Sequence, residues 1–360
     1  MSREMRPYSM RVIAALMSAL AAIAVGVPRV ADEPARPQVT GRETRDHTKS
    51  DAVGAISRGA VSGCTATLIT PSVVITAEHC VRARIVGTTP NRGSMYGPVT
   101  KASDLAFSLG TWAGVFPSPE TTFEAIDVAV ESAVPESRGY VQLGADVALL
   151  RLKSPVTGVL PAELRQFGGH PRMTFLLPER SRDDLLPSES RNIWLLASGS
   201  KPRFAAVGYG SNANMMLNYG GTSKAASGIR TAATVSLLRL GLLYSPSGAK
   251  HAEQDAKNYY EAWTVGENGH ACHGDSGGPL LTGEYDPALK RSRLVVYGVL
   301  SGGSGRDDRL ERNRPEQIPN CEDPGMRNIY TIFGSKVRDF VNETLSRWNQ
   351  PAMNWQERSL

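Results

Sequence analysis

The sequence has few aromatic residues and no dense cluster of charge of one sign. Phe, Tyr and Trp make up 7% of its 360 residues, whereas 35 Gly and 23 Pro are present. This composition suits many short strands joined by turns better than long helices. The 40 Lys and Arg and the 35 Asp and Glu residues are scattered along the chain. Because no basic stretch could follow a phosphate backbone, we expect no binding of nucleic acid.

Long apolar runs are also scarce. A single run, from Val12 to Val27, follows three arginines near the start of the chain. It is shorter than the roughly 20 residues that span a bilayer comfortably. The layout predicts a signal peptide over residues 1–26, with cleavage after Ala24 or Gly26, and a secreted or periplasmic protein that leaves the membrane after cleavage. An uncleaved membrane anchor is the alternative.

Cysteine is rare, with four residues at Cys64, Cys80, Cys272 and Cys321. In an exported protein an even number predicts disulfide bonds, and four cysteines allow three pairings. No pair has the close C-x-x-C spacing of a zinc site, so we predict no metal. No nucleotide or flavin motif is present either, and no cofactor is expected.

Changes in composition along the chain predict a leader followed by two halves rich in strands. Residues 27–52 are polar and predict a leader or pro-region, with one barrel-like half over about 53–160 and a second over about 200–333. The connection at 156–202, rich in Pro, Arg and Ser, carries no clear pattern. The strands that we expect are Thr65–Ile69, Val73–Thr76, Leu105–Leu109, Ile126–Val130, Val147–Leu152, Arg203–Val207, Thr231–Leu238, Ala262–Val265, Leu280–Leu281 and Leu294–Leu300.

Near the end of the chain the apolar period changes from two to about 3.6 residues. Apolar residues between Val337 and Trp348 recur on one helical face after Gly334 and Ser335. The pattern predicts a helix over 335–348 that packs on the second half.

The motif that most strongly indicates catalysis is G-D-S-G-G-P, from Gly274 to Pro279. A serine hydroxyl becomes a nucleophile when a base takes its proton and N–H donors hold the developing oxyanion, and glycines leave room for such donors. A plain glycine-rich turn is the alternative. The string also matches the α/β-hydrolase elbow, but in that class the histidine follows the serine. None of the six histidines lies beyond Ser276, which excludes the elbow.

Two further motifs supply a base and a carboxylate. His79 ends the string V-I-T-A-E-H-C, and with an ordinary pKa of about 6.5 it can exchange a proton with serine near neutral pH. Asp146 stands directly before an apolar strand, where a carboxylate could orient an imidazole. Taken alone, a histidine is more often a surface residue and such an aspartate a turn residue.

These three strings, in the order His, Asp, Ser, resemble the trypsin/chymotrypsin family of serine proteases, in particular secreted members of bacterial type. The similarity covers about residues 53–348. It implies an all-β fold of two antiparallel Greek-key β-barrels, with the active site between them and a C-terminal α-helix. By the same resemblance Cys64 pairs with Cys80, and Cys272 with Cys321. A bond from Cys80 to Cys64 would fix the segment that carries the histidine.

The resemblance assigns a role to each motif residue. It implies that His79 is the general base, Asp146 the orienting carboxylate and Ser276 the nucleophile. The oxyanion hole would be formed by the backbone N–H groups of Gly274 and Ser276.

The resemblance also implies a substrate-binding segment at Ser301 to Gly303 and a primary pocket with His270 at its floor. Trypsin-like members have aspartate at that floor, so we do not expect cleavage after Arg or Lys. Small, apolar or acidic side chains remain open. The chain departs from the family at Gly302, where a large aromatic residue is usual, and at Glu78, where alanine is usual.

The function that we expect is a serine endopeptidase that acts on proteins or peptides through an acyl-enzyme, with protease inhibitors as further partners. A catalytically inactive binding module and a hydrolase of small esters or amides are the alternatives. In many relatives the aspartate at Asp275 pairs with an amino terminus released by cleavage. Whether the chain is such a zymogen stays open.

Overall fold

The structure is a computed structural model, and the residues that it describes belong to one compact unit, Pro37–Leu360. The predicted signal peptide and nearly all of the predicted leader lie outside the described residues. Among the helices of the described part, none has the length and apolar character needed to cross a membrane. The described residues are 51–59, 61–84, 96–113, 117–131, 145–167, 193–195, 203–210, 230–242, 260–267, 269–272, 274–287, 290–304 and 327–358.

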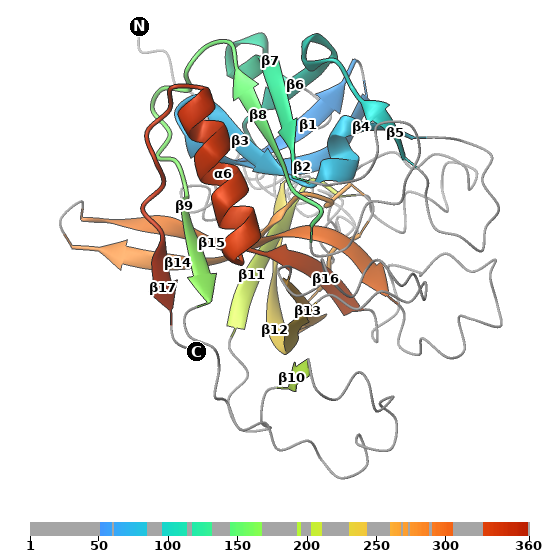
Figure 1. The fold of residues 1–360 in the computed structure, drawn as a ribbon, viewed down its shortest axis with the longest axis vertical. Helices are drawn as coiled ribbons and strands as arrows, with labels where there is room; N and C mark the ends of the chain where they lie inside the picture. The colour runs from blue at the N-terminus through green and yellow to red at the C-terminus, as the bar shows by residue number, and fades with distance from the viewer. Residues whose placement is uncertain are drawn as a thin grey trace, which may run out of the picture. The chain divides into compact units, whose positions relative to one another are not determined.

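The first half of the chain forms a closed antiparallel barrel (Figure 1). β3 and β8 pair with each other, and all four side chains of β3 are buried. This burial explains why three apolar residues in succession, Val73 to Ile75, stand here instead of an alternating pattern. Around the barrel the strands follow the order β1 (Val53–Arg58), β2 (Val61–Thr70), β3 (Val73–Thr76), β8 (Ala148–Leu152), β7 (Thr122–Val130) and β6 (Leu105–Ser108).

The second half forms another antiparallel barrel, which closes where β14 pairs with β15. Its strands follow the order β14 (Pro279–Asp286), β11 (Arg203–Gly208), β12 (Thr231–Leu242), β13 (Tyr260–Gly266), β16 (Arg327–Ile332) and β15 (Arg291–Ser304). The prediction of an all-β fold with two barrels and a C-terminal helix is therefore confirmed. Each of the ten predicted strands overlaps an observed one.

Short elements complete the described part of the fold. β9 pairs in parallel with β15, and β17 near the end of the chain pairs in parallel with β9, so the second sheet extends beyond its barrel. These elements are the 3₁₀ helices η2 (Glu78–Val81), η4 (Ala102–Asp104) and η5 (Pro119–Thr121), and the strands β4 (Arg82–Arg84), β5 (Tyr96–Val99), β9 (Glu163–Phe167), β10 (Ile193–Leu195) and β17 (Gln356–Arg358).

The C-terminal helix α6 (Ser335–Arg347) forms where its apolar period predicts it. Its packing differs from the expectation, however, because its C-terminal end binds the first barrel. The indole N–H of Trp348, which caps the helix, donates to the Asp127 carboxylate of β7 over 2.8 Å, and the Arg151 guanidinium lies 5.8 Å from the indole ring. The prediction that the helix packs on the second half was incomplete, since a helix period does not indicate which neighbour covers the apolar face.

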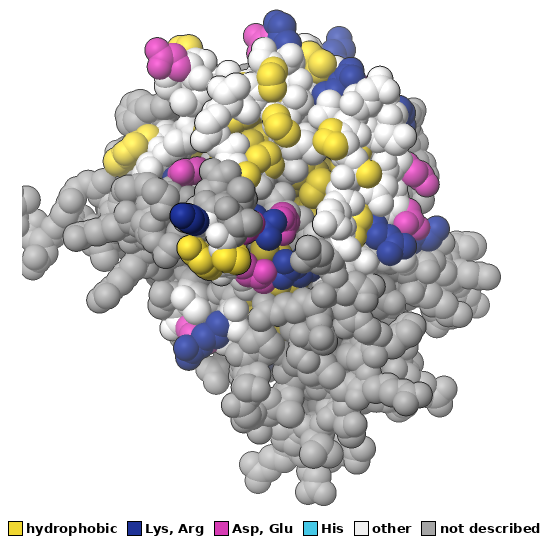
Figure 2. Space-filling view, turned by 90° about the vertical axis from the view of Figure 1, so that its left-hand side faces the viewer, with side chains coloured by type: hydrophobic (Ala, Val, Ile, Leu, Met, Phe, Trp, Pro, Cys, Tyr) yellow, Lys and Arg dark blue, Asp and Glu magenta, His cyan; other side chains and the backbone are white. Residues whose placement is uncertain are grey.

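Ion pairs join β9 to the β14–β15 hairpin. The Arg165 guanidinium lies 2.5 Å from the Glu284 carboxylate, Arg293 lies 3.0 Å from Asp286, and Arg293 also pairs with Glu163. The hairpin extends to the left in Figure 1 and so faces the viewer in Figure 2, where basic and acidic side chains adjoin one another instead of forming separate patches. Among the residues that the structure describes, this face therefore has no patch of one sign that would attract a highly charged partner.

The packing of α6 predicts a large loss of stability when its core is truncated. Leu345 is fully buried in the cluster that the helix shares with the first barrel. Leu345→Ala should lower the free energy of unfolding by about 2 to 5 kcal/mol, because it leaves a cavity. Urea unfolding followed by circular dichroism measures this change. The neighbouring exposed position is a matched control, and Ser346→Ala should change the value by less than about 0.5 kcal/mol. Equal effects of the two variants would contradict the packing.

Candidate active site

The histidine of the second motif lies on the short helix η2, which is tied to the first barrel by a disulfide bond. Cys80, the next residue, is bonded to Cys64 of β2, as predicted. The two sulfur atoms lie near the imidazole of His79. Because they are joined to each other, this group offers no thiolate to a metal ion. Cys272 is also disulfide-bonded. Its predicted partner, Cys321, lies outside the described residues.

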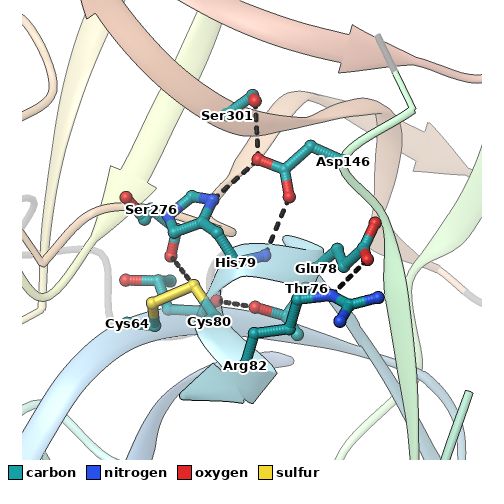
Figure 3. A network of polar contacts seen from close by, with 10 residues as sticks. Cys64, Thr76, Glu78, His79, Cys80, Arg82, Asp146, Ser276 and Ser301 are labelled. Atoms are coloured by element: carbon teal, nitrogen blue, oxygen red, sulfur yellow. Dashed lines mark hydrogen bonds and ion pairs between the residues drawn. A yellow bond between two sulfur atoms is a disulfide. The ribbon is translucent and has the colours of Figure 1, made fainter. Parts of the chain in front are cut away.

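The carboxylate of Asp146 binds the histidine at two points (Figure 3). Its Oδ2 lies 2.7 Å from Nδ1 of His79, and its Oδ1 accepts the backbone N–H of His79 over 2.9 Å. Ser301 of β15 donates its hydroxyl to the same Oδ2 over 2.6 Å. Asp146 itself is only 1% exposed. These bonds orient the ring so that Nδ1–H faces the carboxylate, which leaves Nε2 to take a proton.

The environment of His79 raises the pKa of its imidazole. Burial alone would lower this pKa, because it disfavours the imidazolium. The charge of Asp146, its hydrogen bond and the charge of Glu78 act in the opposite direction and together outweigh burial. His79 is therefore a stronger base than a solvated histidine. Its side chain is 14% exposed, so the ring is not fully closed off from solvent.

The loop that carries Ser276 is pressed against the first barrel. Thr65 of β2 donates its backbone N–H to the carbonyl of Ser276 over 2.8 Å and its hydroxyl to the carbonyl of Gly274 over 3.1 Å. Gly277 adopts φ +79°, and a Cβ there would come within 2.3 Å of the Thr65 carbonyl. Only glycine fits this approach. Ser276 lies beside the imidazole of His79 in Figure 3.

The loop also leaves two backbone donors available. The N–H groups of Asp275, Gly277 and Gly278 donate to carbonyl groups of the protein. By contrast, the N–H groups of Gly274 and Ser276 have no hydrogen-bond partner within the described part of the chain. Two such donors beside a nucleophile could bind the oxygen of a reacting carbonyl group.

Asp275, next to Ser276, is buried with 1% exposure. Its carboxylate accepts the N–H groups of Gly210 over 2.6 Å and of Cys272 over 2.8 Å. A Cβ at Gly210 or Gly208 would collide with this carboxylate. Burial raises the pKa of Asp275 to about 7, although the two N–H bonds act to lower it.

The predicted substrate-binding residues lie around β15 and the segment before Ser276. His270 is buried, and Gly303 pairs with Asn328 of β16. The buried amide of Asn328 accepts the N–H of Ala271 over 2.8 Å and donates to its carbonyl over 3.0 Å. Asn328 thus fixes the segment between His270 and Ser276. Sequence reasoning missed both Asn328 and Thr65, since one polar residue within a strand carries no motif.

Comparison with known proteins agrees with this architecture. A trypsin family model matches residues 38–170, which include the whole first barrel with His79 and Asp146 but not Ser276. A search of curated protein sequences finds no significant match to the chain. The match to the trypsin family model and the two antiparallel barrels support a trypsin/chymotrypsin-like family of serine proteases.

The contacts of Thr65 predict a role in holding the nucleophile loop. Thr65→Val keeps the shape of the side chain but leaves the N–H of Tyr209 and the carbonyl of Gly274 without the hydroxyl that they bind. Each unsatisfied buried group costs about 1 to 3 kcal/mol, so thermal unfolding should begin at a lower temperature. Thr121→Val, which removes a hydroxyl that binds Ser118, is the control and should leave the unfolding temperature nearly unchanged. Equal stability of Thr65→Val and wild type would contradict this role.

The raised pKa of Asp275 predicts a pH dependence of stability. The folded protein binds this proton more tightly than the unfolded chain, so the resulting stabilisation is present at low pH and is lost as the pH rises from about 4 through about 7. Asp275→Asn does not titrate, and its free energy of unfolding should therefore fall less between about pH 5 and about pH 8. Urea unfolding of both proteins at several pH values tests this. Equal slopes would show that Asp275 does not titrate in this range.

Proposed function

We propose that the protein is a secreted serine endopeptidase in which Ser276, His79 and Asp146 form the catalytic triad. The observation that carries the proposal is the double contact of Asp146 with His79, at 2.7 Å and 2.9 Å, beside the serine loop. The raised pKa of His79 and the two available N–H groups of the loop support it further.

The geometry supports an acyl-transfer mechanism. Nε2 of His79 takes the proton of the Ser276 hydroxyl while Oγ attacks the carbonyl carbon of the substrate. The N–H groups of Gly274 and Ser276 hold the oxyanion that forms, and Asp146 stabilises the imidazolium. The imidazolium then returns its proton to the leaving amine as the peptide bond breaks. Water, activated by His79, hydrolyses the acyl-enzyme and regenerates the serine.

Proteins or peptides are the proposed substrates, and protease inhibitors are further candidate partners. Their backbone would lie along Ser301 to Gly303 at the end of β15. Asn328 pairs with Gly303 of this segment, and neither Asn328 nor the predicted floor residue His270 supplies the negative charge that would select Arg or Lys. Small, apolar and acidic side chains thus remain the candidates for the primary site.

Two other functions fit parts of the site. An inactive binding module would not need an oriented base, and a hydrolase of small esters or amides would not need a segment that pairs with a peptide backbone. Kinetics on protein, peptide and simple ester substrates separate these from an endopeptidase.

Covalent labelling tests the proposal directly. A fluorophosphonate probe should label the purified protein at Ser276, as mapped by mass spectrometry, because only an activated serine reacts quickly. Ser276→Ala should abolish labelling, and Asp146→Asn should slow it by roughly 10⁴-fold because the imidazole loses its orientation. Ser103→Ala, at an exposed serine, is the control and should label like wild type.

Absence of labelling would contradict an active enzyme in this form of the chain. The same assay after limited proteolysis separates a precursor from an inactive module, since a precursor would gain labelling at Ser276. A module would not label under either condition.

A further inference from the structure

A buried ion pair lies directly behind the candidate base. Glu78, which precedes His79 in η2, is 0% exposed, and Arg82 is 3% exposed. Nε of Arg82 lies 2.5 Å from Oε1 of Glu78. In Figure 3 the Glu78 side chain lies on the same side of the imidazole as Asp146, with Ser276 on the other.

The pair is tied into the surrounding barrel. Arg82 also donates Nη1 to the carbonyl of Gly97 in β5 over 3.0 Å. From β1, Nη2 of Arg58 donates to the carbonyl groups of Cys80 and Arg82, over 3.1 Å and 2.6 Å. Both ends of the turn that carries His79 are therefore held by guanidinium groups.

Burial makes the two charges of this pair depend on each other. A buried carboxylate or guanidinium is strongly destabilising once its partner is removed, whereas removal of both is often tolerated. Alanine is usual at the position of Glu78 in the family that the chain resembles, so this buried charged pair is a departure from that family.

We propose that the Glu78–Arg82 pair is a positioning device for His79, in which Arg82 fixes the turn and Glu78 adds a second carboxylate, besides Asp146, that favours the imidazolium. This inference rests on the proposed function, in which His79 is the base. The charged groups around the turn in the described residues are Asp146 from the segment before β8, Arg58 from β1, and the pair itself.

The variant Glu78→Gln tests the effect of the negative charge of Glu78 separately from its effect on the position of His79. Glutamine keeps the shape and can still accept from Arg82, but it removes the negative charge whose field raises the pKa of His79. The pKa of His79 should therefore fall, and the acidic limb of kcat/KM should move to lower pH. NMR titration of the imidazole, assigned with His79→Gln, measures the first, and peptide hydrolysis against pH measures the second. Glu124→Gln, in an exposed pair with Lys153, is the control and should move neither.

Variants at Arg82 test the positioning. Arg82→Met should slow fluorophosphonate labelling at Ser276 by at least about tenfold and lower the unfolding temperature, because it leaves Glu78 buried without its partner. The double variant Glu78→Met/Arg82→Met should recover stability relative to Arg82→Met. Should Arg82→Met fail to fold, the double variant and Glu78→Gln still carry the test.

Failure of this inference and failure of the proposed function give different results in these experiments. A wild-type protein whose Ser276 never labels would overturn the function, whereas the NMR titration reports on His79 even without catalysis. An unchanged pKa of His79 in Glu78→Gln, with only the unfolding temperature altered, would overturn the inference and leave the pair a structural feature.

Discussion

The candidate site depends on the close approach of Thr65, in the first barrel, to the serine loop of the second. Four hydrogen bonds meet at this residue: its N–H binds Ser276, its hydroxyl binds Gly274 and Tyr209, and its carbonyl accepts the hydroxyl of Thr76. All four partners lie at or near the contact between the barrels. A shift of one barrel against the other would break several bonds at once, so the position of the serine loop follows from the position of β2.

This approach explains the glycines of the serine motif as well as the chemistry does. At Gly277 a Cβ would strike the Thr76 hydroxyl and the Thr65 carbonyl, and at Gly278 it would strike the carbonyl groups of Val207 and Asp275. Glycine at these two positions therefore permits the close contact between the barrels. The string G-D-S-G-G-P therefore has a structural role in addition to the catalytic one proposed for it.

The sequence predicted the parts of the molecule in which a pattern repeats or a motif is local. Alternating and continuous apolar runs located ten strands, and the period of the tail located the helix. The bond between Cys64 and Cys80 also followed from the resemblance. Contacts between distant strands were missed, such as those of Thr65 and Asn328, because isolated polar residues leave no periodic signal. The added contact of the end of α6 with the first barrel was missed for the same reason: Asp127 and Trp348 are 221 residues apart.

Three buried carboxylates lie around His79 and Ser276, and each has a different set of hydrogen-bond and ion-pair partners. The Asp146 carboxylate is hydrogen-bonded to the imidazole of His79, a backbone N–H and a hydroxyl, whereas the Glu78 carboxylate is bonded to the guanidinium of Arg82. Asp275 has two backbone N–H groups and no cation within the described residues, and its pKa rises to about 7. Backbone N–H groups stabilise the negative charge of a buried carboxylate less than a full positive charge does. A further cation would therefore change the ionisation of Asp275 more than that of the other two carboxylates. The partners of these acids, more than their number, therefore determine how charge is distributed around Ser276.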